Sequence, residues 1–177
     1  MDALEKLHGA GQSLWLNHVA REQIYNGLLI QYIEGGVMTG LFISPQAVCR
    51  TLNTSPAYDV GVCNKINQGL YGESLALELI LEDLHHAADM LRHVFDRTAG
   101  VDGWASLPVS PLLASDRDTQ LQSVSVLHTQ LKRKNTLITV PGLPDMLGAI
   151  EEIVFAGIPI NISLIYSRNQ YLKDAEA

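Results

Sequence analysis

The chain has 177 residues, of which 47% are hydrophobic and 18% charged, and its formal net charge is −7. This length is typical of one domain, and the acidic balance argues against a general nucleic-acid binder. No stretch reaches the ~18 uninterrupted apolar residues of a membrane span, and the N-terminus lacks a secretory signal layout. Cys49 and Cys63 have neither a disulfide framework nor metal-ligand spacing. We therefore expect a single domain over residues 1–177 in a reducing, cytoplasmic setting.

The first part of the chain alternates apolar runs with a helical pattern. Residues 13–19 form a short apolar run that predicts the first strand. Over residues 21–34 apolar side chains recur at helical spacing, and Gly35-Gly36 predicts the end of that helix. Residues 37–44 predict a second strand, which Pro45 stops. The side chains expected to face inward from the helix are Ile24, Leu28, Leu29, Tyr32 and Ile33.

The middle of the chain is dominated by one long helical pattern. Residues 51–56 predict a loop, and a short helix is expected at about residues 60–68. The longest helix is expected at about residues 73–97, closed by Gly100 and Asp102-Gly103. Its apolar stripe consists of Leu77, Ile80, Leu81, Leu84, Ala88, Leu91 and Phe95.

Three further strands are expected in the last part of the chain. Residues 104–110 predict the third strand, in which Pro108 removes one ladder hydrogen bond. Residues 135–142 are β-branched and apolar up to Pro-Gly, which predicts the fourth strand, and residues 160–166 predict the fifth.

Two helices separate these strands. Asp116 or Asp118 is expected to cap the first of them, and the second begins at Asp145 and ends at Gly157. The side chains expected to face inward are Leu121, Val124, Leu127 and Leu131 from the first, and Leu147, Ile150 and Val154 from the second. Strands that alternate with helices predict parallel pairing through right-handed crossovers, in an open doubly wound sheet or part of a barrel.

The strand motifs resemble those of transaldolases, especially the bacterial type. The matching segments are LWLNHV at 14–19, TGLFISP at 39–45, SLPVSP at 106–111, LITVPGLPDM at 137–146 and NISLIYS at 161–167. The helical stretch at 73–104 also resembles the family helix that precedes the third strand. The resemblance implies an α/β fold, a partial (β/α)8 TIM-type barrel with about five parallel strands. It also implies sugar-phosphate chemistry of the pentose phosphate pathway through a lysine Schiff base.

The sequence departs from the family pattern where the chemistry lies. The family's Schiff-base lysine is Thr139 here, and its two carboxylates are Asn17 and Pro108. An imine needs an amine nucleophile, and its proton transfers need a carboxylate in reach. We therefore expect no transaldolase activity. The lysines of the chain lie on predicted helices, near the termini or before the fourth strand: Lys6, Lys65, Lys132, Lys134 and Lys173.

A polar remnant of the family site persists at the strand positions. The asparagine of the family's second strand is Ser44, the threonine of its fifth strand is Ser163, and Asn161 alone is unchanged. Together with Asn17 and Thr139, these side chains form a candidate pocket that either binds a small polar ligand or is a relaxed floor without function. No catalytic residue, cofactor or metal is predicted.

Two charged clusters have a plain structural interpretation. His85, Asp89 and His93 step by four along the long helix and span about 12 Å, which is too far for one metal ion. We expect them to form a solvated face, although adjacent pairs could share a metal. The basic run of residues 132–134 is expected to complement a helix dipole at its C-terminus rather than to form an anion site.

Three functional hypotheses follow from the resemblance. The first is a truncated transaldolase-like pseudoenzyme that acts by binding or assembly. The second is a divergent enzyme of sugar-phosphate or specialised biosynthetic metabolism with a different mechanism. The third is a half-barrel that needs a separate chain carrying strands six to eight. Five strands leave open edges and an apolar inner face, so we expect a homo-oligomer or a partner protein to cover the sheet, unless the chain rearranges into a flatter sheet.

Overall fold

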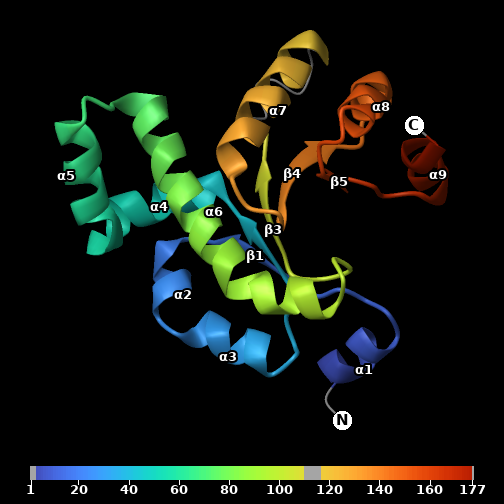
Figure 1. Cartoon of the computed structure of the whole chain (residues 1–177), viewed down its shortest axis with the longest axis horizontal. Coiled ribbons are helices and arrows are strands. Elements are labelled where there is room, and N and C mark those ends of the chain that lie inside the picture. Colours follow the sequence, from blue (N-terminus) through green and yellow to red (C-terminus); the bar gives the residue numbers. More distant parts are fainter. Residues whose placement is uncertain (1–2, 110–116, 177) are drawn as a thin grey trace. The chain divides into compact units, whose positions relative to one another are not determined.

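The computed structural model describes residues 3–109 and 117–176 of the chain. Within them five parallel strands alternate with helices, which is the pattern of a partial (β/α)8 barrel and confirms the predicted fold class (Figure 1). The strand order in the sheet is β1-β2-β3-β4-β5. The strands are β1 (Trp15–Val19), β2 (Gly40–Ile43), β3 (Trp104–Pro108), β4 (Thr136–Pro141) and β5 (Ile160–Ser163).

The helices connect the strands in chain order. The α-helices are α1 (Ala3–Gly9), α2 (Arg21–Tyr25), α3 (Leu28–Glu34), α4 (Pro45–Thr54), α5 (Asp59–Asn67), α6 (Gly72–Arg97), α7 (Arg117–Leu131), α8 (Leu147–Phe155) and α9 (Arg168–Glu176). Short 3-10 helices η1 (Pro56–Tyr58) and η3 (Pro144–Met146) lead into α5 and α8. Among the described residues, none of these helices has the length and apolarity to cross a membrane.

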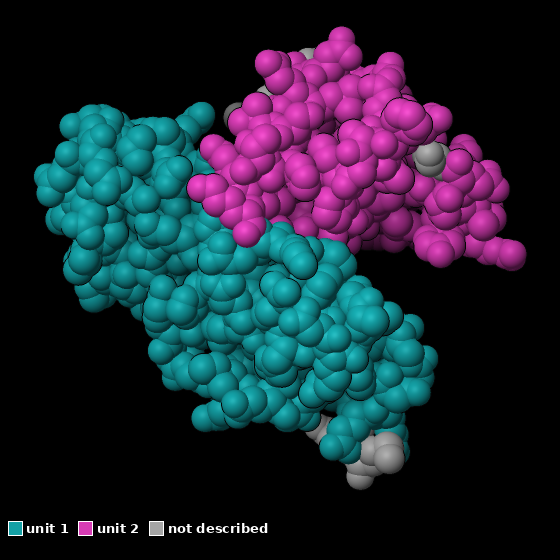
Figure 2. Space-filling view, in the orientation of Figure 1, with its two compact units in different colours: residues 1–105, 133–135 teal, residues 106–132, 136–177 magenta. Residues whose placement is uncertain are grey.

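The chain forms two compact units (Figure 2). Unit 1 consists of residues 1–105 and 133–135, and unit 2 consists of residues 106–132 and 136–177. Strand β3 contributes to both, because Trp104 and Ala105 belong to unit 1 and its remaining residues belong to unit 2. The single domain over residues 1–177 stays a prediction.

In unit 1 the parallel pair β1 and β2 contains a bulge. Trp15 pairs with Gly40 and Leu16 with Leu41, but the next pairing joins Val19 to Ile43. The bulge therefore adds one residue to β1, next to the site at which the family pattern has a carboxylate. The ring of Trp15 lies against Gly40, where an added Cβ would approach it to 2.4 Å.

The predicted single helix over residues 21–34 is wrong. Two short helices, α2 and α3, meet at Gly27, whose φ of 80° lies in the left-handed region that favours glycine. The break rotates the second helix, so its buried side chains are only Leu29 and Ile33. Leu28 and Tyr32, which were expected to face inward, are each 42% exposed.

The loop predicted over residues 51–56 is also wrong at its start. Helix α4 extends through Thr54, and the second strand is shorter than expected, since it begins at Gly40 rather than at residue 37. Local hydrogen bonds stabilise the last turn: the hydroxyls of Thr51 and Thr54 donate to the carbonyls of Ala47 and Arg50. Such side-chain bonds hold polar residues in a helix that periodicity alone does not reveal.

Helix α6 confirms the predicted long helix, and Asn135 attaches it to the sheet within unit 1. The Asn135 side chain is 1% exposed, and its Nδ2 donates to the carbonyls of Ala88 and Gly103, at 2.8 Å in each case. Ala88 lies on the buried face of α6, and Gly103 directly precedes β3. One amide group therefore links a helix, the start of β3 and the start of β4.

Unit 2 is built on the parallel pair β4 and β5, in which Thr139 pairs with Asn161 and Pro141 with Ser163. The fifth strand ends at Ser163, earlier than predicted. Helix α7 buries Val124, Leu127 and Leu131 as expected, with Leu121 half-buried. Strand β3 ends at Pro108, earlier than the predicted 110, and the expected N-cap Asp116 lies outside the described residues.

The inward face of helix α8 differs from the prediction. Its buried side chains are Ala149, Ile150 and Ile153, whereas Val154 is 55% exposed. The 3-10 turn η3 precedes the helix, so the α-helix starts at Leu147 rather than Asp145 and a different stripe faces the core.

We predict that Asn135→Ala lowers the free energy of unfolding by about 2–3 kcal/mol, because two buried carbonyls lose their donor. Urea denaturation followed by circular dichroism measures the change. The matched control is Asn53→Ala, which removes one exposed bond to the Cys49 carbonyl and should cost less than about 0.5 kcal/mol. Equal losses in the two variants would contradict the anchoring role.

Candidate functional site

The candidate site residues lie on or just after strands, where a parallel sheet places its chemistry. Thr139 on β4 is 4% exposed, and its Oγ1 accepts a hydrogen bond from Asn161 Nδ2 on β5 at 3.1 Å. On the other side Thr139 Oγ1 lies 2.6 Å from Ser106 Oγ on β3. The Ser106 hydroxyl also donates to the carbonyl of Leu137 at 3.1 Å. Three neighbouring strands thus contribute polar side chains to one cluster in unit 2.

These contacts form a continuous chain of hydrogen bonds. Asn161 Nδ2 donates to Thr139 Oγ1, and either hydroxyl can be the donor in the 2.6 Å contact between Thr139 and Ser106. The Ser106 hydroxyl also lies within hydrogen-bond distance of the Leu137 carbonyl. We call the series of Asn161, Thr139, Ser106 and the Leu137 carbonyl the hydroxyl chain. Each of its two hydroxyls has protein partners on both sides.

Ser163 and Pro108 lie beside the hydroxyl chain without joining it. The Ser163 hydroxyl donates to the carbonyl of Val140 at 3.2 Å and so returns to the backbone of β4. Pro108 is the last residue of β3 rather than an interior one. Its missing N–H therefore falls at the strand end, where proline is tolerated.

In unit 1 the predicted site residues are turned toward their own backbone. Asn17 is exposed in the β1 bulge, and its Oδ1 accepts from the N–H of His18 at 2.7 Å. His18 has a φ of 60°. Ser44 is 2% exposed and caps helix α4, with its Oγ accepting from Ala47 N at 3.3 Å and donating to Gln46 Oε1 at 2.9 Å.

The structure thus brings together Thr139 and Asn161 of the predicted set, with Ser163 on the same pair of strands. Asn17 and Ser44 belong to unit 1 and are not hydrogen-bonded to one another within its described residues. The five-residue pocket as a whole stays a prediction. Ser106 was missed, although it lies two residues before Pro108, and strand alternation places both on one face.

A cavity opens next to the ends of β4 and β5 in unit 2. Its volume is about 430 Å³, within the range of small-molecule sites. The loops after both strands and helix α9 line this cavity, which we call the β4–β5 cavity, with residues that include Gly142, Leu147, Leu164, Tyr166, Lys173 and Asp174. Thr139, Asn161 and Ser163 are not among its lining residues.

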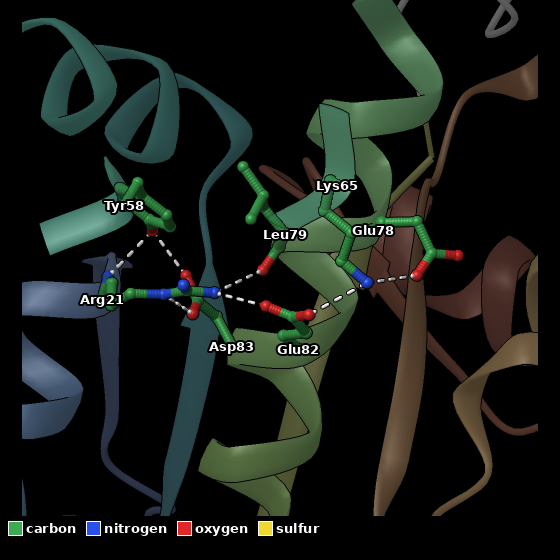
Figure 3. A network of polar contacts seen from close by, with 7 residues as sticks. All are labelled: Arg21, Tyr58, Lys65, Glu78, Leu79, Glu82 and Asp83. Carbon is green, nitrogen blue, oxygen red and sulfur yellow. Dashed lines mark hydrogen bonds and ion pairs between the residues drawn. The ribbon is translucent and has the colours of Figure 1, made fainter. Parts of the chain in front are cut away.

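Unit 1 contains a polar network that sequence periodicity did not indicate (Figure 3). Arg21, at the start of α2, donates from Nε to Asp83 Oδ1 at 2.7 Å and from Nη2 to Glu82 Oε2 at 3.0 Å. The hydroxyl of Tyr58 donates to Asp83 Oδ2 and accepts from the Arg21 N–H at 3.0 Å. Lys65 extends the network with ion pairs to Glu78 at 3.1 Å and Glu82 at 3.0 Å.

Burial sets the titration of this network. Asp83 and Tyr58 are fully enclosed, and burial raises the pKa of both groups. Hydrogen bonds from Tyr58 and Arg21 offset part of that cost for Asp83. Burial also opposes ionisation of Glu82, but hydrogen bonds from Lys65 and Arg21 outweigh it and lower the pKa of Glu82. Since Asp83 already has protein donors on both oxygens, we interpret this network as a structural anchor rather than a ligand site.

The histidine-rich face of α6 is occupied by an ion pair. Arg133 donates from Nε and Nη2 to the two oxygens of Asp89, at 2.6 and 2.9 Å. These hydrogen bonds lower the pKa of Asp89. Over residues 3–109 and 117–176, no three histidine, cysteine, aspartate or glutamate side chains are grouped so as to hold a metal ion.

Comparison with known proteins identifies the relatives of this chain. Residues 14–177 match the model of the family described as transaldolase/fructose-6-phosphate aldolase. The chain is 31% identical to transaldolase 2 of Streptomyces coelicolor over 99% of its own length and 47% of that protein. It is 31% identical to the transaldolase of Thiobacillus denitrificans over 94% of its length and 46% of that protein. The chain thus spans about half the length of the curated relatives that it matches.

We predict that Tyr58→Phe lowers the free energy of unfolding by about 1–3 kcal/mol near pH 7, because ionised Asp83 loses a buried donor. The folded-state pKa of Asp83 is raised above its ordinary value of 3.8. This carboxyl therefore favours the folded state most at acidic pH, and that contribution is lost as the pH rises through the raised pKa. The penalty of the variant should accordingly shrink on acidification to about pH 4, where neutral Asp83 needs the donor less.

Chemical denaturation at both pH values measures the two penalties. Tyr71→Phe is the matched control, because Tyr71 is 65% exposed and its hydroxyl should matter little at either pH. A penalty for Tyr58→Phe that grows on acidification would contradict the assigned role of the hydroxyl.

Proposed function

Because the chain belongs to the transaldolase/fructose-6-phosphate aldolase family, we propose that it is a transaldolase-like pseudoenzyme that acts by binding or assembly. The resemblance aligns Thr139 with the Schiff-base lysine and aligns Asn17 and Pro108 with the carboxylates of the family pattern. Imine chemistry needs an amine nucleophile and a proton carrier, and these three side chains provide neither.

The hydroxyl chain is the observation that carries this proposal. The hydroxyl of Thr139 is hydrogen-bonded to the Ser106 hydroxyl and accepts from Asn161, so it is held by its neighbours on both sides. A nucleophilic hydroxyl needs an adjacent general base to take its proton. The side chains that contact the Thr139 hydroxyl are an amide and a second hydroxyl, and neither of them is a general base. This arrangement supports a packed polar floor in place of a nucleophile.

The lysines in the described part of unit 1 support the same conclusion. Lys65 is the most closely paired of them, and its hydrogen bond to Glu82 raises its pKa, whereas an imine-forming lysine needs a lowered pKa. Lys6 lies on helix α1, outside the strands. Lys132 of unit 2 and Lys134 of unit 1 both precede the start of β4, and the family chemistry belongs to the other end of that strand.

Assembly is the second part of the proposal. Strands β1 and β5 stand at the two ends of the strand order, and unpaired strand edges favour pairing with another chain. Unit 2 also exposes large apolar side chains, with Phe155 at 94% and Tyr166 at 84%. A second copy of the chain is the partner that we propose. A different protein, including a chain that carries the later strands of the barrel, is the competing partner.

One observation favours the alternative function, a divergent enzyme of sugar-phosphate or specialised biosynthetic metabolism. Lys173 lines the β4–β5 cavity, and this places an amine at the carboxyl ends of two strands. Asp174 lines the same cavity and could carry protons. An imine on Lys173 would restore covalent chemistry at a new position.

We predict that sodium borohydride traps no fructose 6-phosphate on this chain, because no lysine occupies the Schiff-base position on β4. Intact-protein mass spectrometry after reduction provides the measurement. The Streptomyces coelicolor relative, treated identically, is the positive control. A covalent adduct on this chain would overturn the pseudoenzyme proposal, and loss of that adduct in Lys173→Gln would establish the divergent enzyme.

We predict that the purified chain is a homodimer, with twice the chain mass of 19.4 kDa, at micromolar concentration. Strand edges and exposed apolar side chains are the physical reason. Multi-angle light scattering after size exclusion measures the mass. A monomeric mass would refute self-assembly, and a defined complex with another protein would assign the covering role to that partner instead.

A further inference from the structure

The walls of the β4–β5 cavity are fixed by one glutamine side chain. Nε2 of Gln170 donates to the carbonyls of Gly142 and Leu164, the latter at 2.8 Å, and its Oε1 accepts from Tyr166 N at 3.1 Å. Gly142 follows β4, whereas Leu164 and Tyr166 follow β5. The Gln170 side chain therefore connects the loops after β4 and β5 to helix α9 by hydrogen bonds. We call these hydrogen-bonded segments the frame of the cavity.

Backbone strain occurs at this frame. Leu164 has a φ of 63°, in the left-handed region, although it is not a glycine. Such strain is maintained where the surroundings determine the conformation, and it is frequent at ligand clamps. The bond from Gln170 to the Leu164 carbonyl holds this conformation, which places Leu164 on the cavity wall.

Asp174 brings a buried carboxylate to this cavity without a protein partner for one of its oxygens. The residue is 5% exposed, and its Oδ2 is buried with no hydrogen-bond partner among the described residues. Its place is made by Gly142, because a Cβ there would lie 2.5 Å from Oδ2. A buried carboxylate without a donor is costly, so a positively charged donor is the group that would stabilise it most.

The remaining wall is mostly apolar. Leu143, Pro144, Leu147 and Leu164 line the cavity together with the ring of Tyr166. A ligand that complements this cavity has a protonated amine to pair with the carboxylate and a small apolar group to contact the apolar wall. We propose that the β4–β5 cavity binds such an amine, with the ammonium group paired to Asp174. This site uses neither Thr139 nor Asn161, so it does not depend on the hydroxyl chain.

A simple alkylamine and an apolar amino acid both carry an ammonium group on an apolar body. Only the amino acid also has a carboxylate, with which Lys173 could pair. Lys173 lines the same cavity and carries the charge that would pair with the carboxylate of an amino acid. Tighter binding of an amino acid than of the corresponding amine would identify the zwitterion as the ligand. Tighter binding of the amine would identify the free amine.

The proposal is tested by isothermal titration calorimetry of the full chain with 3-methylbutylamine and L-leucine. 3-Methylbutanol, which has the same apolar body without the charge, is the control ligand. We expect at least one of the two amines to bind, and the alcohol to bind at least about tenfold more weakly. No binding of either amine up to millimolar concentration, or equal binding of the alcohol, would overturn the proposal.

Two variants locate the site. Asp174→Asn should weaken amine binding at least about tenfold, and its melting temperature should equal or exceed that of the parent, because an unpartnered charge is removed. Asp145→Asn is the matched control, since Asp145 is exposed and does not line the cavity.

Leu143→Trp provides an independent test that remains available if Asp174→Asn does not fold. Leu143 is 38% exposed and lines the cavity, so a tryptophan there should fill the space and abolish binding. Unchanged amine affinity in a folded cavity variant would refute this site, whereas a borohydride adduct would refute only the pseudoenzyme proposal.

Discussion

A buried carboxylate needs hydrogen-bond donors to replace water, and this requirement applies in both units of the chain. Among the described residues, Asp83, Asp102 and Asp174 are the buried aspartates. Asp83 accepts hydrogen bonds from Arg21 and Tyr58, and Asp102 accepts one from the hydroxyl of Ser13. Oδ2 of Asp174 receives no donor from the described protein. Carboxylates with protein donors hold segments of the chain together. A buried carboxylate oxygen without a protein donor is a place where a ligand can supply one.

The pairing of Asp83 explains how unit 1 is held together without a continuous helix after β1. Arg21 is the first residue of α2, two positions after the end of β1, whereas Tyr58 lies in the 3-10 turn η1 and Asp83 in the middle of α6. The guanidinium also stacks over the Tyr58 ring, 4.4 Å from its centroid. Three segments distant in sequence thus converge on one charge. Breaking one partner leaves the others buried and unpaired, which is why such networks are sensitive to single substitutions.

The polar side chains at the strand positions that resemble the family site make local hydrogen bonds. Thr139 is enclosed by hydrogen bonds from neighbouring strands, Ser44 caps a helix, and Asn17 accepts from its own chain. Each of these polar groups thus has a local hydrogen-bond partner. In the same unit as Thr139, the β4–β5 cavity keeps a charged side chain and apolar walls. These two observations support the proposal that the chain binds a ligand without covalent catalysis.

The sequence by itself determined the family and the alternation of five strands with helices, but it did not predict helices α1, α4 and α9. Alternating apolar runs and helical stripes located all five strands and the long helix α6, because these signals are local and repeat along the chain. It missed features that depend on a single residue, such as the break at Gly27 and the extension of α4 to Thr54. A left-handed glycine or a hydroxyl bonded to its own helix barely changes the hydrophobic pattern.

Only the tertiary structure decided which polar groups meet. Ser106 joins Thr139 because β3 and β4 are neighbours in unit 2, although 33 positions separate these residues in sequence. Asp83 finds Arg21 across 62 positions, and Asp174 meets Gly142 through a contact that requires the absence of a side chain. Hydrophobic periodicity reports how each segment faces the core, but it carries no information about which distant segment lies opposite. The partner of a buried polar group is set by strand register and helix packing, and these exist only once the chain has folded.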